Sequence, residues 1–245
     1  MNVNRILSFL FLLLLLTSCG SKYKIEGSSS VARLDGKKLY LKIFKNNEWI
    51  PIDSAEVIHG MFTMKGPVDS VSMVTLYMDN ESIMPIVLEE GSIVVSIENT
   101  QISVKGTPLN DAFYSFIDKK HSMEIKIEDL QRKEARMVMD GVNLEDVHEE
   151  LNKEGEALVK EMNVYVKKFV SDNYENVLGP TVFMMLCSSL PYPIMTPRIE
   201  DIMKDAPVSF KNDKMVREFI AKAKENMQLL EERRRMEQNA RRMHP

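Results

Sequence analysis

Reactive side chains are scarce in this sequence. Its 245 residues include only 2 cysteines, 4 histidines and 1 tryptophan. So few cysteines exclude a small domain that several disulfides hold together. Basic residues are also in the minority, with 32 Lys and Arg against 36 Asp and Glu. Since a nucleic-acid-binding surface has to neutralise phosphates, this balance argues against nucleic acid as a partner.

Sequence motifs that carry catalysis are missing as well. There is no Cys-x-x-Cys, glycine-rich phosphate loop, Gly-x-Ser-x-Gly motif or dinucleotide-binding fingerprint, and no two histidines have the i, i+4 spacing of a helical zinc site. The adjacent acids Glu89-Glu90 and Glu149-Glu150 are interpreted as solvated, because acid–base catalysis needs carboxylates at set separations in a cleft. We therefore predict a protein that is not an enzyme and holds no cofactor or metal.

The N-terminus has the clearest signal. Arg5 precedes an apolar run, Ile6 to Leu16, that is too short for the about 20 residues of a membrane-spanning helix but suits the core of a signal peptide. Leu16-Thr17-Ser18-Cys19 follows and resembles the bacterial lipobox. The resemblance implies cleavage before Cys19, attachment of diacylglycerol to its sulfur, and acylation of the new terminus with a fatty acid such as palmitate. The alternative is a plain secretory signal with an incidental cysteine.

The residues after Cys19 bear on the destination. Position 20 is Gly rather than the Asp associated with retention in the inner membrane, and no acid occurs before Glu26. Lipoprotein sorting rules therefore favour an outer-membrane lipoprotein that faces the periplasm, with inner-membrane or cell-surface placement as alternatives. The expected partners are the membrane, through the lipidated N-terminus, and an unidentified envelope protein or small ligand.

The remaining chain, with 44% apolar and 28% charged residues, has a globular balance and divides into parts of different character. We predict an α+β protein, in which an N-terminal antiparallel β-sandwich or partly open barrel is followed by an all-helical C-terminal region. The expected parts are a signal peptide at 1–18, the lipidated cysteine and tether at 19–30, a β domain at 23–106, a helical region at 107–230 and a charged tail at 231–245.

The β domain is predicted from short apolar segments that end at turn residues. Pro85 lies in one of them and indicates an edge strand or bulge, because proline cannot donate to a strand ladder. The segments are Tyr23–Ile25, Leu39–Phe44, Trp49–Ile58, Met61–Lys65, Val71–Tyr77, Ile83–Leu88, Ile93–Ile97 and Ile102–Val104.

The helical region is predicted from caps and apolar stripes. Thr107-Pro108 and Thr196-Pro197 combine an N-cap residue with proline at the first helical position. Pro180 opens a buried-looking piece, Thr181 to Leu186, and Asn212 is expected to cap the last helix. The residues expected to face inward include Leu109, Ala112, Phe113, Phe116 and Ile117, then Leu144, Val147, Leu151, Leu158, Met162, Val166 and Phe169, and finally Met215, Phe219, Ala223, Met227 and Leu230.

Several motifs of the β part resemble a family. Tyr23-Lys24-Ile25-Glu26-Gly27 and Gly60-Met61-Phe62-Thr63-Met64-Lys65-Gly66 are similar to a domain of unknown function of bacterial envelope lipoproteins, which often precedes a thioredoxin-like domain of the antioxidant or disulfide-reductase type. Gly60 and Gly66 allow turn conformations, and Phe62 and Met64 alternate onto one buried face. This motif, formed by Gly60, Phe62, Met64 and Gly66, is expected to serve folding and no chemistry.

The resemblance leaves the function open. No Cys-x-x-Cys and no βαβ pattern follows Leu230, so we expect no thioredoxin-like domain here. Cys187 would be the one thiol left after lipidation, and its apolar neighbours favour a buried structural role over a mixed disulfide. We predict a lipid-anchored, non-catalytic binding or scaffold module. Alternatives are an accessory partner of a thioredoxin-like thiol-disulfide or peroxide-reducing enzyme, and an enzyme with an unrecognised site.

Overall fold

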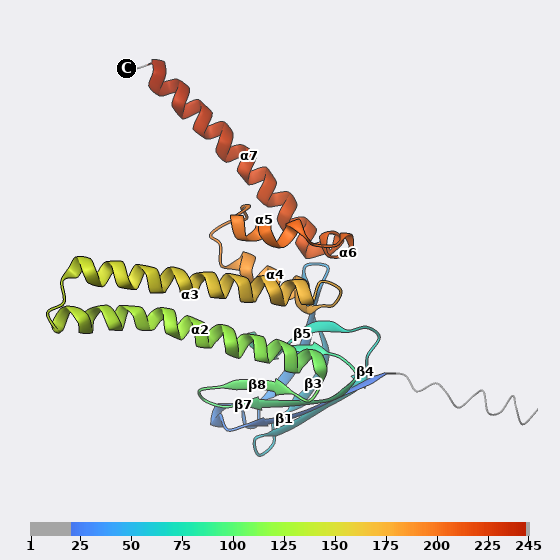
Figure 1. Ribbon diagram of the computed structural model, residues 1–245. Coiled ribbons are helices and arrows are strands. Elements are labelled where there is room, and N and C mark those ends of the chain that lie inside the picture. Colours follow the sequence, from blue (N-terminus) through green and yellow to red (C-terminus); the bar gives the residue numbers. More distant parts are fainter. Residues whose placement is uncertain (1–20, 244–245) are drawn as a thin grey trace, which may run out of the picture. The chain divides into compact units, whose positions relative to one another are not determined.

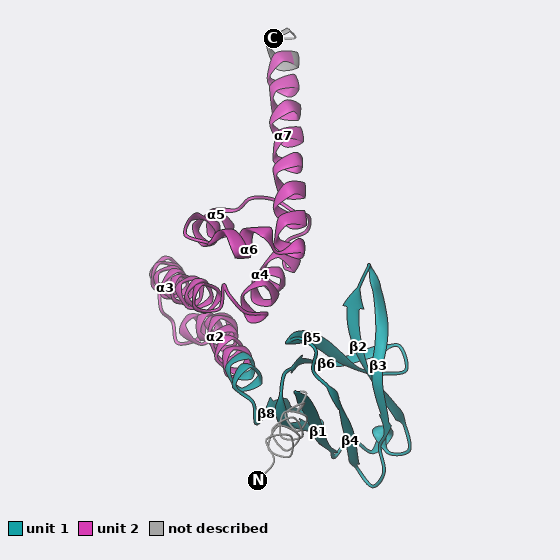
Figure 2. Ribbon diagram, turned by 90° about the vertical axis from the view of Figure 1, so that its right-hand side faces the viewer, with its two compact units in different colours: residues 1–114 teal, residues 115–245 magenta. Residues whose placement is uncertain are grey.

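The computed structural model describes residues 21–243, and the chain divides into two compact units, residues 1–114 and 115–245 (Figure 2). The first unit contains every strand of the described part, whereas the second is helical. The α+β class expected from the sequence is therefore confirmed. The two units are described separately below.

The first unit holds two four-stranded sheets, which are not closed into a barrel (Figure 1). One sheet has the order β4-β1-β7-β8 and the other β3-β2-β5-β6. Every predicted segment is a strand, and a short 3₁₀ helix, η2 (Ala32–Leu34), follows the first. The strands are β1 (Lys22–Ser29), β2 (Lys38–Lys45), β3 (Glu48–Glu56), β4 (Met61–Pro67), β5 (Ser72–Met78), β6 (Glu81–Leu88), β7 (Gly91–Ile97) and β8 (Ile102–Lys105).

Strand β1 corrects two expectations. It pairs antiparallel with β4 but parallel with β7, so the sheet is not purely antiparallel. It also occupies residues 22–29, most of the Ser- and Gly-rich segment expected to be a tether. Tyr23 and Ile25 alternate into the core with Gly27, and strands on both sides complete the backbone hydrogen bonds. Pairing on two sides outweighs the weak strand propensity of Gly and Ser.

Two aromatic rings lie over glycines across the β1–β4 pair. The register places Phe62 opposite Gly27 and Tyr23 opposite Gly66, with Ile25 and Met64 paired between them. A Cβ atom at Gly27 would lie 2.0 Å from Phe62 Cζ, and one at Gly66 would lie 2.9 Å from the Tyr23 ring. Each glycine therefore leaves room for the ring opposite, which gives the folding motif a concrete role.

The free edge of β6 is occupied by a side chain. Asn110 accepts a hydrogen bond from Val87 N–H (2.9 Å) and donates one to Val87 O (2.7 Å), as a neighbouring strand would. Pro85, two residues earlier, lies in this edge strand, as expected. Tyr114 Oη donates to Pro85 O at 2.8 Å. The edge thus has partners without a further strand.

Glu89 connects this edge to the helix α2 (Pro108–Met139). Its Oε1 accepts the backbone N–H groups of Leu109 (2.9 Å) and Asn110 (3.0 Å), and Asn110 also donates to Thr107 Oγ1. The solvated position expected for Glu89 is wrong, because the side chain is buried and serves the unpaired donors of the first helical turn. Negative charge is favourable at that end of a helix.

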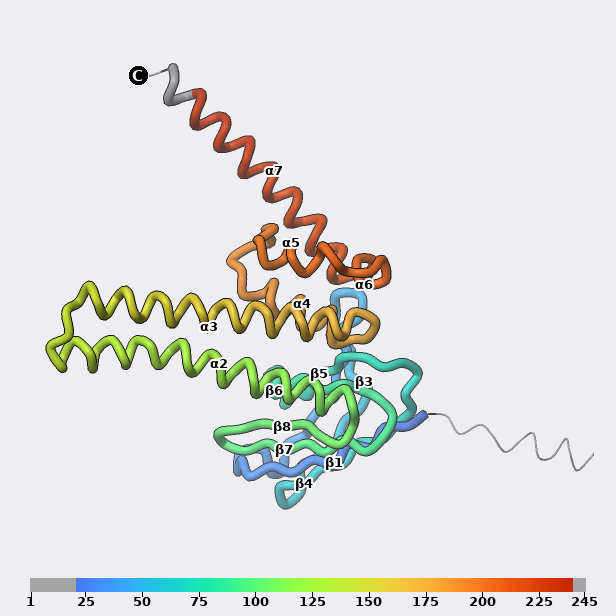
Figure 3. Tube along the Cα trace, viewed as in Figure 1, coloured from blue at the N-terminus to red at the C-terminus, as the bar shows by residue number. Residues whose placement is uncertain are grey.

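The second unit is built on an antiparallel pair, α2 and α3 (Figure 3). Lys133 of α2 binds Glu150 and Glu154 of α3, and Phe116 packs on Tyr165 and Phe169. Further aromatic contacts join Phe183 to Phe210 and Phe219. The helices after α2 are α3 (Leu144–Asp172), α4 (Leu178–Ser188), α5 (Pro197–Lys204), α6 (Val208–Asn212) and α7 (Lys214–Met243).

Helix ends and inward faces depart locally from expectation. Asp213, not Asn212, caps α7, because its Oδ1 accepts the N–H groups of Met215 and Val216. Helix α4 begins two residues before Pro180. Leu144 and Met215, expected to face inward, are exposed; the buried residues near the starts of these helices are Val147 and Val216.

Gly27→Ala should destabilise the β unit by about 1–3 kcal/mol, because the new methyl group displaces the buried Phe62 ring. Urea unfolding followed by the fluorescence of Trp49, which lies in β3, measures this. In a Phe62→Leu background the same substitution should cost less. Equal costs in both backgrounds would contradict the proposed clash.

Asn110→Ala should lower the free energy of unfolding by about 3 kcal/mol, because it leaves buried Val87 N–H and C=O groups unpaired. Urea unfolding followed by the fluorescence of Trp49 measures this change as well. Asn212→Ala is the matched control, since Asn212 is exposed and should change stability by less than about 0.5 kcal/mol. Similar effects of the two substitutions would show that the edge contact is dispensable.

Candidate functional site

A groove of about 850 Å³ runs along the second unit, between α2, α3 and α5. Its aliphatic lining includes Ile127 and Leu130 from α2 and Leu151, Val159 and Val164 from α3. Gly155 lies among them, and a Cβ there would be 3.3 Å from Leu130 Cδ1, so the helices approach closely at this point. The volume lies within the range of small-molecule and peptide sites.

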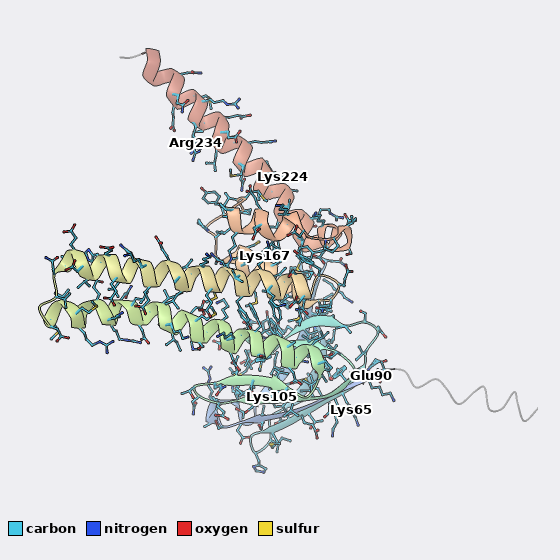
Figure 4. The ribbon with its side chains drawn as sticks, viewed as in Figure 1. Lys65, Glu90, Lys105, Lys167, Lys224 and Arg234 are labelled. Atoms are coloured by element: carbon cyan, nitrogen blue, oxygen red, sulfur yellow. The ribbon has the colours of Figure 1, made fainter. Side chains whose placement is uncertain are left out.

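Charged side chains lie at the α5 end of the groove. Lys167 of α3 binds Asp201 of α5 at 2.7 Å and lies 3.8 Å from Asp205 (Figure 4). Its hydrogen bond with Asp201 raises the pKa of Lys167, so this lysine stays charged and paired. The charge of Lys167 is therefore already balanced by Asp201 of α5 and by Asp205, the residue that caps the end of α5.

Arg198 lies at the second position of α5, after Pro197 and the N-cap Thr196, whose Oγ1 accepts Ile199 N–H at 3.3 Å. Arg198 Nε is buried and has no hydrogen-bond partner among the described residues. Burial lowers the pKa of Arg198, but an arginine starts so high that it remains charged at neutral pH. The groove thus contains a half-buried cation without a counterion in residues 21–243.

The residues of the predicted lipidation signal, Leu16, Thr17, Ser18 and Cys19, lie outside the described residues. Of the two glycines of the Gly60–Gly66 motif, Gly60 lies in a turn with positive φ, whereas Gly66, expected in a turn as well, lies inside strand β4. His59 and Gly60, both with positive φ, form a two-residue turn in which Ile58 and Met61 exchange backbone hydrogen bonds. Phe62 and Met64 are buried behind it.

Cys187 lies buried in α4. Burial raises the pKa of its thiol to about 12, so the reactive thiolate is rare at neutral pH. The buried position expected from its apolar neighbours is confirmed.

The other polar candidates are dispersed. His148 contacts Glu134 at 3.1 Å, His121 is exposed, and His244 lies outside the described residues. Glu149 and Glu150 are exposed, as expected. In the part of the chain that the structure describes, no three His, Cys, Asp or Glu side chains are grouped so that they could hold a metal ion.

The charged segment at the end of α7 is exposed over residues 231–239, and the helix extends beyond its neighbours (Figure 2). Within residues 21–243, no helix is both long enough and apolar enough to cross a membrane.

The two four-stranded sheets form a small β domain, and its last strand, β8, leads directly into helix α2. Residues 23–113 match the family described as Domain of unknown function (DUF4369). The resemblance seen in the sequence is thereby confirmed, and no thioredoxin-like domain is detected. No curated protein matches the chain.

Sequence reasoning missed the groove and Arg198. Thr196-Pro197 correctly predicted where α5 begins, and Arg198 follows directly. That signal specifies a helix start, but not the helices against which it packs. The one available clue was a cation in a first helical turn, where positive charge is unfavourable.

Cys187 should react slowly with a thiol-specific disulfide reagent. In a Cys19→Ser protein, which leaves Cys187 as its one thiol, we expect labelling at pH 8 to be about tenfold or more slower in buffer than in urea. Absorbance of the released thiol measures both rates. Moving the thiol one residue, with Cys187→Ser and Ser188→Cys, should restore fast labelling because position 188 is exposed. A fast reaction of native Cys187 would contradict its burial.

Proposed function

We propose that the protein is a lipid-anchored, non-catalytic envelope lipoprotein that faces the periplasm and acts as a binding or scaffold module. The anchor is inferred from Leu16-Thr17-Ser18-Cys19, and Gly20 favours the outer membrane. Acylation at two or more positions would give stable attachment, whereas one chain is marginal. The described residues would then stand in the periplasm beside the membrane.

The observation that carries the binding role is the groove between α2, α3 and α5. Its aliphatic walls expose Val159 and Val164 to 48% and 61%, although Val166 and Val170 of the same helix, α3, are buried. An open apolar surface of this kind next to an unpaired cation suits a ligand that has an apolar part and an anionic group. Within residues 21–243, the scattered histidines and the protonated Cys187 form no group of side chains suited to catalysis.

The alternative role, as an accessory of a thioredoxin-like enzyme, is supported by the resemblance described above, because domains of that kind often precede a thioredoxin-like domain. Its covalent form requires a thiol that exchanges with a disulfide, and exchange proceeds through the thiolate. Because Cys187 is buried and its pKa is raised, a mixed disulfide is disfavoured. Any such partnership would therefore be non-covalent.

A photo-crosslinking residue at position 159 tests the proposal in intact cells that produce the full chain. We expect one discrete adduct, since Val159 lines the groove, and mass spectrometry of the purified adduct should find an acylated Cys19 as the N-terminal residue. An adduct whose N-terminal residue carries no fatty acid would contradict the proposed lipid anchor.

The same residue at position 138 is the matched control. Val138 is exposed to 45%, close to the 48% of Val159, but it does not line the groove. The binding role predicts no discrete adduct at position 138. Identical adduct patterns at both positions would contradict a specific site.

A further inference from the structure

We infer that the groove binds an extended peptide segment through its terminal carboxylate, with Arg198 as the residue that recognises the carboxylate. This inference rests on the proposed binding role and specifies its ligand. Three features support it: the state of Arg198, the free carboxamides of the lining and the aliphatic walls.

The first feature is the charge that lacks a counterion. Arg198 makes no ion pair with the described residues, whereas Lys167 beside it is bound by Asp201. A guanidinium that is partly removed from water gains more from an incoming anion than an exposed one, since less hydration is left to lose. Its fork of N–H donors matches the two oxygens of a carboxylate.

The second feature is a set of carboxamides. Gln131, Asn152 and Asn163 line the groove from α2 and α3, and their side chains make no hydrogen bond within residues 21–243. A carboxamide both donates and accepts, so it complements the N–H and C=O groups of a peptide backbone. A fatty acid has the same carboxylate but no groups along its chain that would use these carboxamides.

The third feature is the aliphatic wall formed by Ile127, Leu130, Val159 and Val164, which suits apolar side chains of a bound peptide. The acids of the lining do not cancel the attraction at Arg198: Asp201 is paired with Lys167, and Glu134 contacts His148. Glu156 is exposed, as is Lys160 of the opposite sign one helical turn later. Among these charges of the lining, Arg198 is half-buried and makes no ion pair with the described residues.

Binding of a fluorescein-labelled pentapeptide of leucine and alanine to the full-length chain tests the inference by fluorescence anisotropy. We expect the peptide with a free terminal carboxylate to bind about tenfold or more tightly than the same peptide with a terminal amide. Arg198→Gln should abolish this preference, and Arg198→Lys should restore part of it. Arg136→Gln, which removes an exposed charge of α2 outside the groove, should leave it intact.

Decanoate as competitor separates the two sources of a carboxylate. Weak competition is expected, whereas displacement of the peptide by equimolar decanoate would assign the groove to fatty acids and overturn the peptide proposal. Equal affinity for carboxylate and amide peptides, or an Arg198→Gln protein that keeps the preference, would overturn it too. If these results coincide with a discrete crosslink at position 159, the ligand class is wrong but the binding role stands.

Discussion

The hydrogen bonds of Glu89 and Asn110 are the constraint on which the described structure depends most. One carboxylate oxygen binds the first backbone donors of α2, while the adjacent amide completes the backbone of β6. The first turn of α2 is thereby held to the end of β6 by buried polar contacts, which lose most when one member is missing. The same helix that starts there continues without interruption to Met139 and supplies one wall of the groove.

Most of the element pattern could be predicted from the sequence because local chemistry determines it. Alternating apolar residues predicted the strands, and Thr107-Pro108 and Thr196-Pro197 predicted where two helices begin. The motif Gly60 to Gly66 predicted a turn and a buried face, but not that its aromatic ring lies over Gly27. That relation depends on strand register, which neither segment contains by itself.

The errors share one physical origin. Glu89 has the sequence context of a solvated turn, and only the tertiary fold brings a helix terminus to it. The parallel pairing of β1 with β7 joins segments about 70 residues apart, so no local pattern specifies it. The sequence likewise does not single out Arg198 until α5 packs against α3 beside the groove. Long-range contacts determined the chemistry of the candidate site, and hydrophobic periodicity does not encode them.

The outer strands of the second sheet have a consequence for behaviour at high concentration. Asn110 already occupies the outward N–H and C=O of Val87 in β6, and β3, at the opposite side, contains Pro51, which has no N–H to offer. Neither strand can easily template another copy of the sheet. Copies at high concentration would thus be hindered from joining strand to strand through β3 and β6.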